Sequence, residues 1–151
     1  MKKYYLAAGA VVTGDVTLGE DVSVWHNAVL RGDSGAITVG DRTNIQDGCI
    51  VHEKTAIGSD CTIGHGAIVH GCTIGDGCLI GMGSIILNGA VLGDGCLVGA
   101  GALVTGKTNA PAGSVLLGSP AQIVKTLTPE QMDAQRHDAM HYVDLAKKTL
   151  P

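Results

Sequence analysis

Phenylalanine is absent from this chain of 151 residues, and Trp25 is its only tryptophan. The chain instead contains 23 glycines. These residues supply too little bulk for a conventional globular core. A narrow rod filled by valine, isoleucine, leucine, alanine and cysteine needs no large aromatic side chains, so the composition favours a solenoid.

The chain also lacks a cluster of lysine and arginine, and its formal net charge is −4. Nucleic acids and anionic membrane surfaces attract proteins mainly through such basic clusters. We therefore expect no nucleic acid and no membrane among the partners of this protein.

A six-residue repeat is the strongest pattern in the sequence. An α-helix cannot keep a period of six on one face, whereas a parallel β-helix places one short strand in each hexad and three hexads in each coil. The repeat predicts an all-β fold, a parallel β-helix. Its aliphatic positions form three runs, which are Leu6, Val12, Leu18, Val24 and Leu30; Val39, Ile45, Val51, Ile57, Ile63 and Val69; and Ile74, Ile80, Ile86, Leu92, Val98, Val104, Ala110 and Leu116.

The repeat also predicts the domain boundaries. Met1-Lys2-Lys3 and the apolar stretch after it could be misread as a signal peptide, but Leu6 and Val12 are already in register, so we expect the first coil there. Residues 1–120 are predicted to form the β-helix. Residues 121–151 are predicted to carry a helix of four to five turns along the rod, because Thr128-Pro129-Glu130-Gln131 has the pattern of a capped helix start.

Four of the five cysteines are predicted to be buried free thiols. Cys49, Cys61, Cys78 and Cys96 occupy the small inward position of their hexads, and the last three stack in one column. Parallel side chains in such a ladder point the wrong way for a disulfide. A reducing, cytoplasmic compartment is the corresponding expectation.

Stacking three hexads in each coil brings two histidines together. One outward column reads Arg31, His52, His70 and Leu87, and neighbouring strands lie about 4.8 Å apart. His52 and His70 can therefore share one metal ion.

A third histidine belongs to another face. His65 lies in the outward column Asp47, His65 and Met82, and a hexad strand spans roughly 15 Å. Zinc holds its nitrogen ligands at about 2.1 Å, so His65 of the same chain cannot join the pair. A neighbouring subunit can supply it, and a cyclic homotrimer repeats that contact three times.

Three imidazoles without a fourth protein ligand are typical of catalytic zinc, which keeps one position for water and lowers the pKa of that water to about 7. Iron(II) or cobalt would also accept these ligands. We expect four polar residues around the interface to support the site, namely Arg31, Asp33, Gln46 and Asp47. Arg31 would pair with an aspartate across the contact, and Gln46 would hydrogen-bond the metal-bound water.

The sequence resembles the γ-class carbonic anhydrases over nearly its whole length. The matching segments are Arg31-Gly32-Asp33, Thr43-Asn44-Ile45-Gln46-Asp47-Gly48, Val51-His52, and residues 64–75, which include His65 and His70. The resemblance implies a left-handed coil and a trimer whose zinc is held by His52 and His70 of one subunit and His65 of the next. It also implies an Arg31–Asp33 interface pair, Gln46 as the water partner, Asp47 as a supporting acid, and Tyr142 as a helix tyrosine that approaches the metal.

Two features depart from the archetypal enzyme of that family. Its acidic loop with a proton-shuttling glutamate is missing, since only residues 53–56 precede Ile57, and Ser34 replaces an acid. Carbon dioxide hydration releases a proton in each turnover, so this loss bears on the rate more than on the metal. Glu53 could substitute as the shuttle or could be a solvated corner residue.

The predicted function is therefore that of a carbonic anhydrase-like lyase, in which metal-bound hydroxide reversibly converts CO2 to bicarbonate at a trimer interface. Two alternatives stay open. A hexapeptide-repeat acyltransferase that uses acyl-CoA would share the coils and the Gly118-Ser119-Pro120-Ala121 ending, although no long loop with an isolated catalytic histidine is present. A metal-binding scaffold or accessory protein would keep the site without hydrating CO2. His26, and the pair His137 and His141, are predicted to be surface residues.

Overall fold

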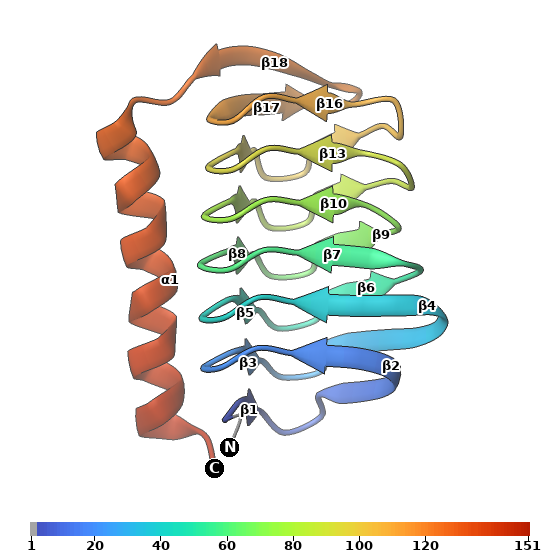
Figure 1. Cartoon of the computed structure of the whole chain (residues 1–151), viewed down its shortest axis with the longest axis vertical. Coiled ribbons are helices and arrows are strands. Elements are labelled where there is room, and N and C mark those ends of the chain that lie inside the picture. The colour runs from blue at the N-terminus through green and yellow to red at the C-terminus, as the bar shows by residue number, and fades with distance from the viewer. Residues whose placement is uncertain (1–2) are drawn as a thin grey trace.

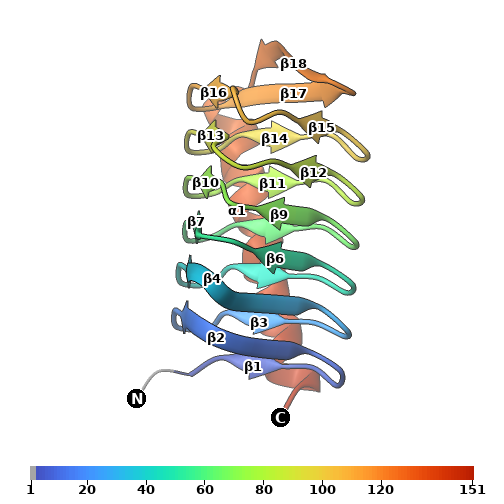
Figure 2. The same cartoon turned by 90° about the vertical axis from the view of Figure 1, so that its right-hand side faces the viewer.

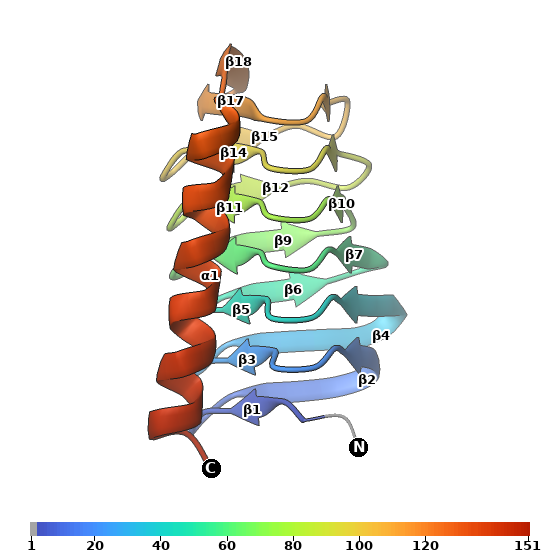
Figure 3. The same cartoon turned by 60° about the vertical axis from the view of Figure 1, so that its left-hand side comes forward.

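The computed structural model describes residues 3–151, so Met1 and Lys2 of the predicted first coil lie outside the described residues. The chain winds upward from its N-terminus as a three-sided rod, and helix α1 (Pro129–Thr149) runs back down beside it (Figures 1, 2 and 3). Following the strands in Figures 1 and 2 shows a left-handed coil. The predicted fold class, a left-handed parallel β-helix with a C-terminal helix, is confirmed.

One face of the rod is an eight-stranded sheet. Its strands are parallel except for the last. In spatial order they are β1 (Tyr5–Leu6), β3 (Ser23–Val24), β5 (Asn44–Ile45), β8 (Thr62–Ile63), β11 (Leu79–Ile80), β14 (Leu97–Val98), β17 (Ser114–Gly118) and β18 (Ala121–Thr126). We call this the first face.

The other two faces are joined into one ten-stranded sheet, because β2 (Val11–Leu18) and β4 (Val29–Val39) bend across the corner between them. The start of β4 pairs with the second face, which continues through β6 (Ile50–His52), β9 (Ile68–His70), β12 (Ile85–Ile86) and β15 (Leu103–Val104). The end of β4 pairs with the third face, which continues through β7 (Thr55–Ile57), β10 (Thr73–Ile74), β13 (Val91–Leu92) and β16 (Asn109–Ala110).

The corner inside β4 holds three residues more than a regular hexad, because the aliphatic positions Leu30 and Val39 are nine residues apart instead of six. Residues 32–36 of β4 lie opposite only Glu53 and Lys54 of the next coil. The chain from Leu30 to Val39 is therefore one continuous bent strand. Its extra residues, which include Asp33, have no pairing partners in the next coil.

The interior is the ladder of aliphatic residues that the repeat predicted. Ile45, Ile63, Ile80 and Val98 are paired coil to coil, and each is fully buried. All five cysteines are free and buried, which was predicted for the four at the small inward position; Cys72, for which nothing was predicted, is buried as well. Small side chains fill the narrow rod without a phenylalanine.

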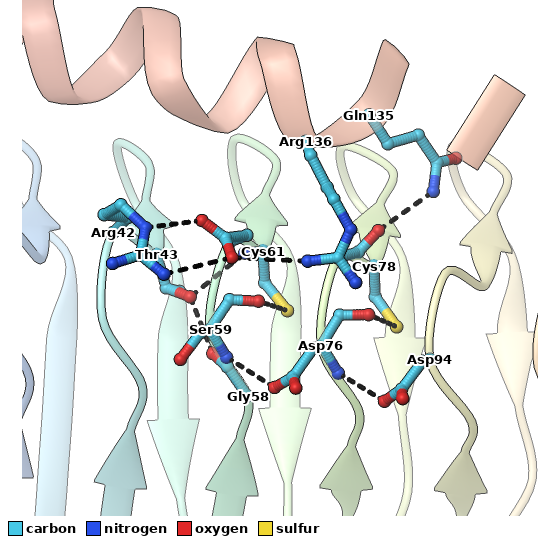
Figure 4. Close-up of polar contacts among 12 residues, drawn as sticks. Arg42, Thr43, Gly58, Ser59, Cys61, Asp76, Cys78, Asp94, Gln135 and Arg136 are labelled. Carbon is cyan, nitrogen blue, oxygen red and sulfur yellow. Dashed lines mark hydrogen bonds and ion pairs between the residues drawn. The ribbon is translucent and has the colours of Figure 1, made fainter. Parts of the chain in front are cut away.

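Aspartates hold the corner that lies beneath α1. Figure 4 shows the carboxylates of Asp76 and Asp94 accepting hydrogen bonds from the backbone N–H groups of Ser59 and Asp76, at 2.8 and 2.7 Å. Asp60 forms ion pairs with Arg42 and with Arg136 of α1, at 2.7 and 3.2 Å. The carboxylates of Asp76 and Asp94 thus give a hydrogen-bond acceptor to corner N–H groups that pair with no strand.

Helix α1 begins as predicted and ends later. Thr128 is its N-cap, and Thr128 and Gln131 form the reciprocal capping box. The helix has 21 residues, or about six turns rather than four to five. Among the described residues, no helix is long and apolar enough to cross a membrane.

A buried glutamine fastens α1 to the rod. Gln135 Nε2 donates to the backbone carbonyls of Gly77 and Gly95, at 3.1 and 3.2 Å, and Gln135 is only 7% exposed. The helix therefore buries a polar anchor together with Ala139, Val143 and Ala146.

Strand β18 was not predicted. The six-residue repeat predicted that the ladder ends at Pro120, but residues 121–126 turn back and pair antiparallel with β17. An antiparallel strand needs only a tight turn and does not follow the six-residue period, so the repeat carried no signal for it. The sheet thus continues past the predicted boundary at residue 120.

Replacing the buried anchor should loosen the helix. We expect Gln135→Ala to lower the free energy of unfolding by about 1–3 kcal/mol, because two buried carbonyls lose their donor. Urea denaturation followed by circular dichroism measures this change. Asp138→Ala, an exposed position on the same helix, is the matched control and should change stability by less than about 0.5 kcal/mol. Equal stability of the two variants would show that Gln135 is not an anchor.

The buried thiols should make the fold sensitive to alkaline pH. Burial raises the pKa of Cys49 to about 11 and that of Cys72 to about 12, from an ordinary value of 9.0. Protonation therefore favours the folded state, and its contribution, complete below pH 9, should be lost as the pH rises toward 11 to 12. Urea midpoints at pH 8 and 11 should differ less for the Cys49→Ala/Cys72→Ala variant than for the native chain. Identical pH slopes would contradict the prediction.

Candidate metal centre

His52 and His70 project from the second face on neighbouring coils. They are directly paired across β6 and β9, and Arg31 is paired with His52 on the other side. Val51 and Val69 point inward and are fully buried, so the side chains that follow them point outward. The two histidines meet as the predicted column requires.

The nitrogen atoms of this pair are spaced as ligands of one ion. His52 Nδ1 lies 3.3 Å from His70 Nε2. Two nitrogens bound to a tetrahedral zinc at 2.0–2.1 Å would lie about 3.3–3.4 Å apart. The donors present therefore fit half of a zinc site.

Asp33 and Arg31 contact the far nitrogen of His52. Asp33 Oδ1 lies 3.1 Å from His52 Nε2 and 3.3 Å from Arg31 Nε, and Arg31 Nη2 lies 3.0 Å from the same His52 nitrogen. That nitrogen can donate to Asp33 or accept from Arg31, but not both. Donation to Asp33 leaves the Nδ1 lone pair facing His70, which is the tautomer that a metal needs.

This contact also acts on the carboxylate. The hydrogen bond with His52, followed by the nearby Arg31 charge, holds the pKa of Asp33 below its ordinary value. Arg31 and Asp33 thus pair within one chain, and both side chains are about half exposed. Their predicted role between subunits stays a prediction.

Glu53 lies beside the histidine pair. Its carboxylate and the ring nitrogens of His52 and His70 all lie within 4.8 Å of one another, and this is the only such group of three or more potential ligands within residues 3–151. The backbone of Glu53 is in the left-handed region, at φ 62°, which costs energy for a side chain of this kind. Thr55 Oγ1 holds this turn by donating to the carbonyl of His52 at 2.9 Å.

His65 lies on the first face and outside that group. Its Nδ1 is 3.2 Å from Asp47 Oδ1, and its side chain is 53% exposed. Tyr142 of α1 packs edge-on against Trp25, with ring centroids 5.7 Å apart. Burial and then the charge of Asp47 raise the pKa of Tyr142. Helix α1, which carries Tyr142, packs against β3, β5 and β8 of the first face, the face of His65.

Gln46 is held one residue before Asp47. It is 5% exposed, and its Nε2 donates to Asn44 Oδ1 at 3.1 Å. Asn44 in turn donates to Thr62 Oγ1 at 2.9 Å. Asn44 was not predicted to be a site residue, although its outward position two residues before Gln46 was an available signal.

A hollow of about 280 Å³ begins at Gln46 and continues along the first face. Its residues include the glycines Gly64, Gly81 and Gly99 and the apolar side chains of Leu79, Met82 and Leu97. The glycines leave room over the strands, and the apolar side chains around them make the hollow largely apolar.

The remaining histidines are exposed, as predicted for surface residues. His26 contacts the backbone carbonyl of Ala8 at 3.2 Å. His137 and His141 lie on exposed positions of α1. None of the three joins the ligand group of His52 and His70.

Comparisons with known proteins agree on the hexapeptide repeat, and the curated relatives are named as carbonic anhydrases. Residues 71–106 match the family described as "Bacterial transferase hexapeptide (six repeats)". The chain is 49% identical to the "Probable carbonic anhydrase" of Methanocaldococcus jannaschii, over 97% of this chain and 94% of that protein. It is 40% identical to the mitochondrial gamma carbonic anhydrase 2 of Arabidopsis thaliana, over 97% of this chain but only 56% of that protein.

Solved structures share the fold. A hexapeptide transferase family protein from Anaplasma phagocytophilum superposes with a TM-score of 0.88 at 36% identity, and the match covers 97% of this chain and 93% of the other. With the histidine pair, the separate third histidine and these relatives together, the chain belongs to the γ-class carbonic anhydrase family of hexapeptide-repeat proteins.

Proposed function

We propose that this protein is a zinc enzyme that reversibly hydrates CO2 to bicarbonate, with each site shared between two subunits of a homotrimer. The observation that carries the proposal is the 3.3 Å separation of His52 Nδ1 and His70 Nε2 on one face, with His65 on another. The relatives named as carbonic anhydrases support the reaction.

The donor set supports zinc as the metal. His52 and His70 of one subunit and His65 of the next would supply three imidazoles and leave one position open, as in catalytic zinc sites. A bound zinc ion lowers the pKa of a coordinated water to about 7 and so supplies a nucleophile at neutral pH. Imidazole ligands accept iron(II) and cobalt as well, so the native metal must be measured.

Two apolar surfaces support the trimer. The first face has the hollow that begins at Gln46. The second face has an outward column of partly or well exposed aliphatic residues beside the histidines, namely Val29, Ile50, Ile68, Ile85 and Leu103. Packing the second face of one copy on the first face of the next would bury both surfaces. Such a contact between unlike faces closes into a ring of three when each copy is rotated by a third of a turn.

Four polar residues would support the reaction, namely Gln46, Asp47, Glu53 and Tyr142. Because Gln46 Nε2 donates to Asn44, the side-chain carbonyl oxygen of Gln46 would accept a hydrogen bond from the reacting water. Asp47 would hold the ring of His65 in place. Glu53, whose carboxylate lies beside the histidine pair, would accept the released proton, and Tyr142 would line the site from the helix.

An acyltransferase is the second candidate. The hollow on the first face and the transferase-family structural neighbour favour it, because an acyl carrier needs an apolar groove. A metal-binding scaffold is the third. The five buried free thiols support a reducing, cytoplasmic location for any of the three.

The metal and the reaction are tested together. Freshly purified protein should contain about one zinc for each subunit, and stopped-flow assays should show CO2 hydration above a heat-killed control. His52→Ala and His70→Ala should lose both properties, while His137→Ala, an exposed histidine on α1, should keep them. The rate should rise with buffer concentration, and more steeply in Glu53→Gln, because external buffer then replaces the carboxylate.

The possible failures point to different functions. Protein without bound metal would favour acyl transfer. Protein with zinc but without hydration above the control would favour the scaffold. A Glu53→Gln variant with an unchanged buffer dependence would leave Glu53 as a solvated corner residue.

The subunit arrangement gives a separate prediction. His65→Ala should empty the site while the trimer survives, because the apolar surfaces remain. Arg31→Ala should shift the sedimentation equilibrium toward smaller species, because an interface charge is lost. Lys125→Ala, on exposed β18, is the control and should sediment as the native protein. A monomeric His65→Ala beside an unchanged Arg31→Ala would reverse these two roles.

A further inference from the structure

Asn88 contacts His70 on the side away from His52. It follows Leu87 in the column of Arg31, His52 and His70, one coil above the end of β9. Asn88 Oδ1 forms a hydrogen bond with His70 Nδ1. No role was predicted for Asn88 from the sequence, because it lies at an exposed corner with no motif around it.

This contact determines which nitrogen of the His70 ring carries the hydrogen. An amide oxygen only accepts, so His70 Nδ1 must carry the hydrogen. In the neutral ring the lone pair is then on Nε2. Nε2 is the atom that lies 3.3 Å from His52 Nδ1, so the lone pair is directed at the position of the metal.

The same arrangement holds for the other two histidines. Asp33 contacts His52 Nε2, and Asp47 contacts His65 Nδ1. Each of the three rings therefore has an oxygen acceptor at the nitrogen that faces away from its proposed metal bond. Two of these acceptors are carboxylates and one is a neutral amide.

Glycines make the space that Asn88 occupies. A Cβ on Gly71 would lie 2.5 Å from Asn88 Nδ2, and Gly71 has φ +66°. On the coil above, a Cβ on Gly106 would lie 2.2 Å from the backbone oxygen of Asn88. The backbone N–H of Gly89 also donates to the carbonyl of Gly71 at 2.9 Å, which ties the Asn88 corner to the coil of His70. The amide is thus placed by its neighbours on both sides.

We propose that Asn88 is a positioning residue for His70, which fixes the Nδ1–H tautomer and the ring plane so that Nε2 is ready to bind the metal. The proposal rests on the metal site proposed above.

Zinc affinity tests this role in the whole protein. Competition with a chelating dye should show Asn88→Ala binding zinc about 10–100-fold more weakly than the native chain. Asn88→Asp restores an oxygen acceptor and should bind at least as tightly as the native chain. Asn109→Ala removes an exposed asparagine of β16, away from the histidines, and should leave the affinity unchanged.

The tautomer is measured without metal. Long-range ¹⁵N–¹H correlation spectra of the metal-free protein should show His70 as the Nδ1–H form in the native chain, Asn88→Asp and Asn109→Ala, and lose that preference in Asn88→Ala. Zinc binding that is equal in the native chain and Asn88→Ala, with the Nδ1–H form retained, would overturn the proposal. If the native protein binds no zinc, the proposed function fails, and the spectra still decide whether Asn88 sets the tautomer.

Discussion

Hydrogen bonds between neighbouring coils are the constraint on which this structure depends. Ile50 N donates to Ala67 O, and Gly71 N donates to His52 O, each at 3.0 Å. Such bonds fix the register, so residues one coil apart in sequence become direct neighbours on the surface. The histidine pair, its acceptors and the inward ladder all follow from that register, and a slip by one residue would turn His52 and His70 into the rod.

The sequence was sufficient to predict the features that follow the six-residue repeat. The hexad spacing predicted the ladder through Ile45 and Ile63 and the column of His52 and His70, because period alone decides which side chains share a face. The spacing could not determine the hand of the coil, which was predicted only from the family resemblance. It also carried no signal for β18, which does not follow the repeat. The role of Asn88 was also missed, because an asparagine at a corner is common and only the contact with His70 Nδ1 distinguishes it.

The helix and the corner residues show why polar groups could be misjudged from sequence. Gln135 looks like a surface residue on a polar helix, yet it is buried against two carbonyls of the rod. Glu53 looks like a loop residue, yet its strained backbone places a carboxylate beside two imidazoles. In both cases the partner lies on an element distant in sequence, and no local pattern carries that information.

The reversed direction of β18 has a consequence for how the rod ends. A parallel coil finishes with unpaired backbone groups that could template the first coil of another molecule, and growth of this kind would produce fibres. Because β18 runs against β17 and lies over the upper end of the rod (Figure 1), an incoming β1 would meet a strand of opposite polarity there. Lys125 adds an exposed charge to the same strand. Strand β18 therefore opposes end-to-end polymerisation of these rods and favours their association side by side.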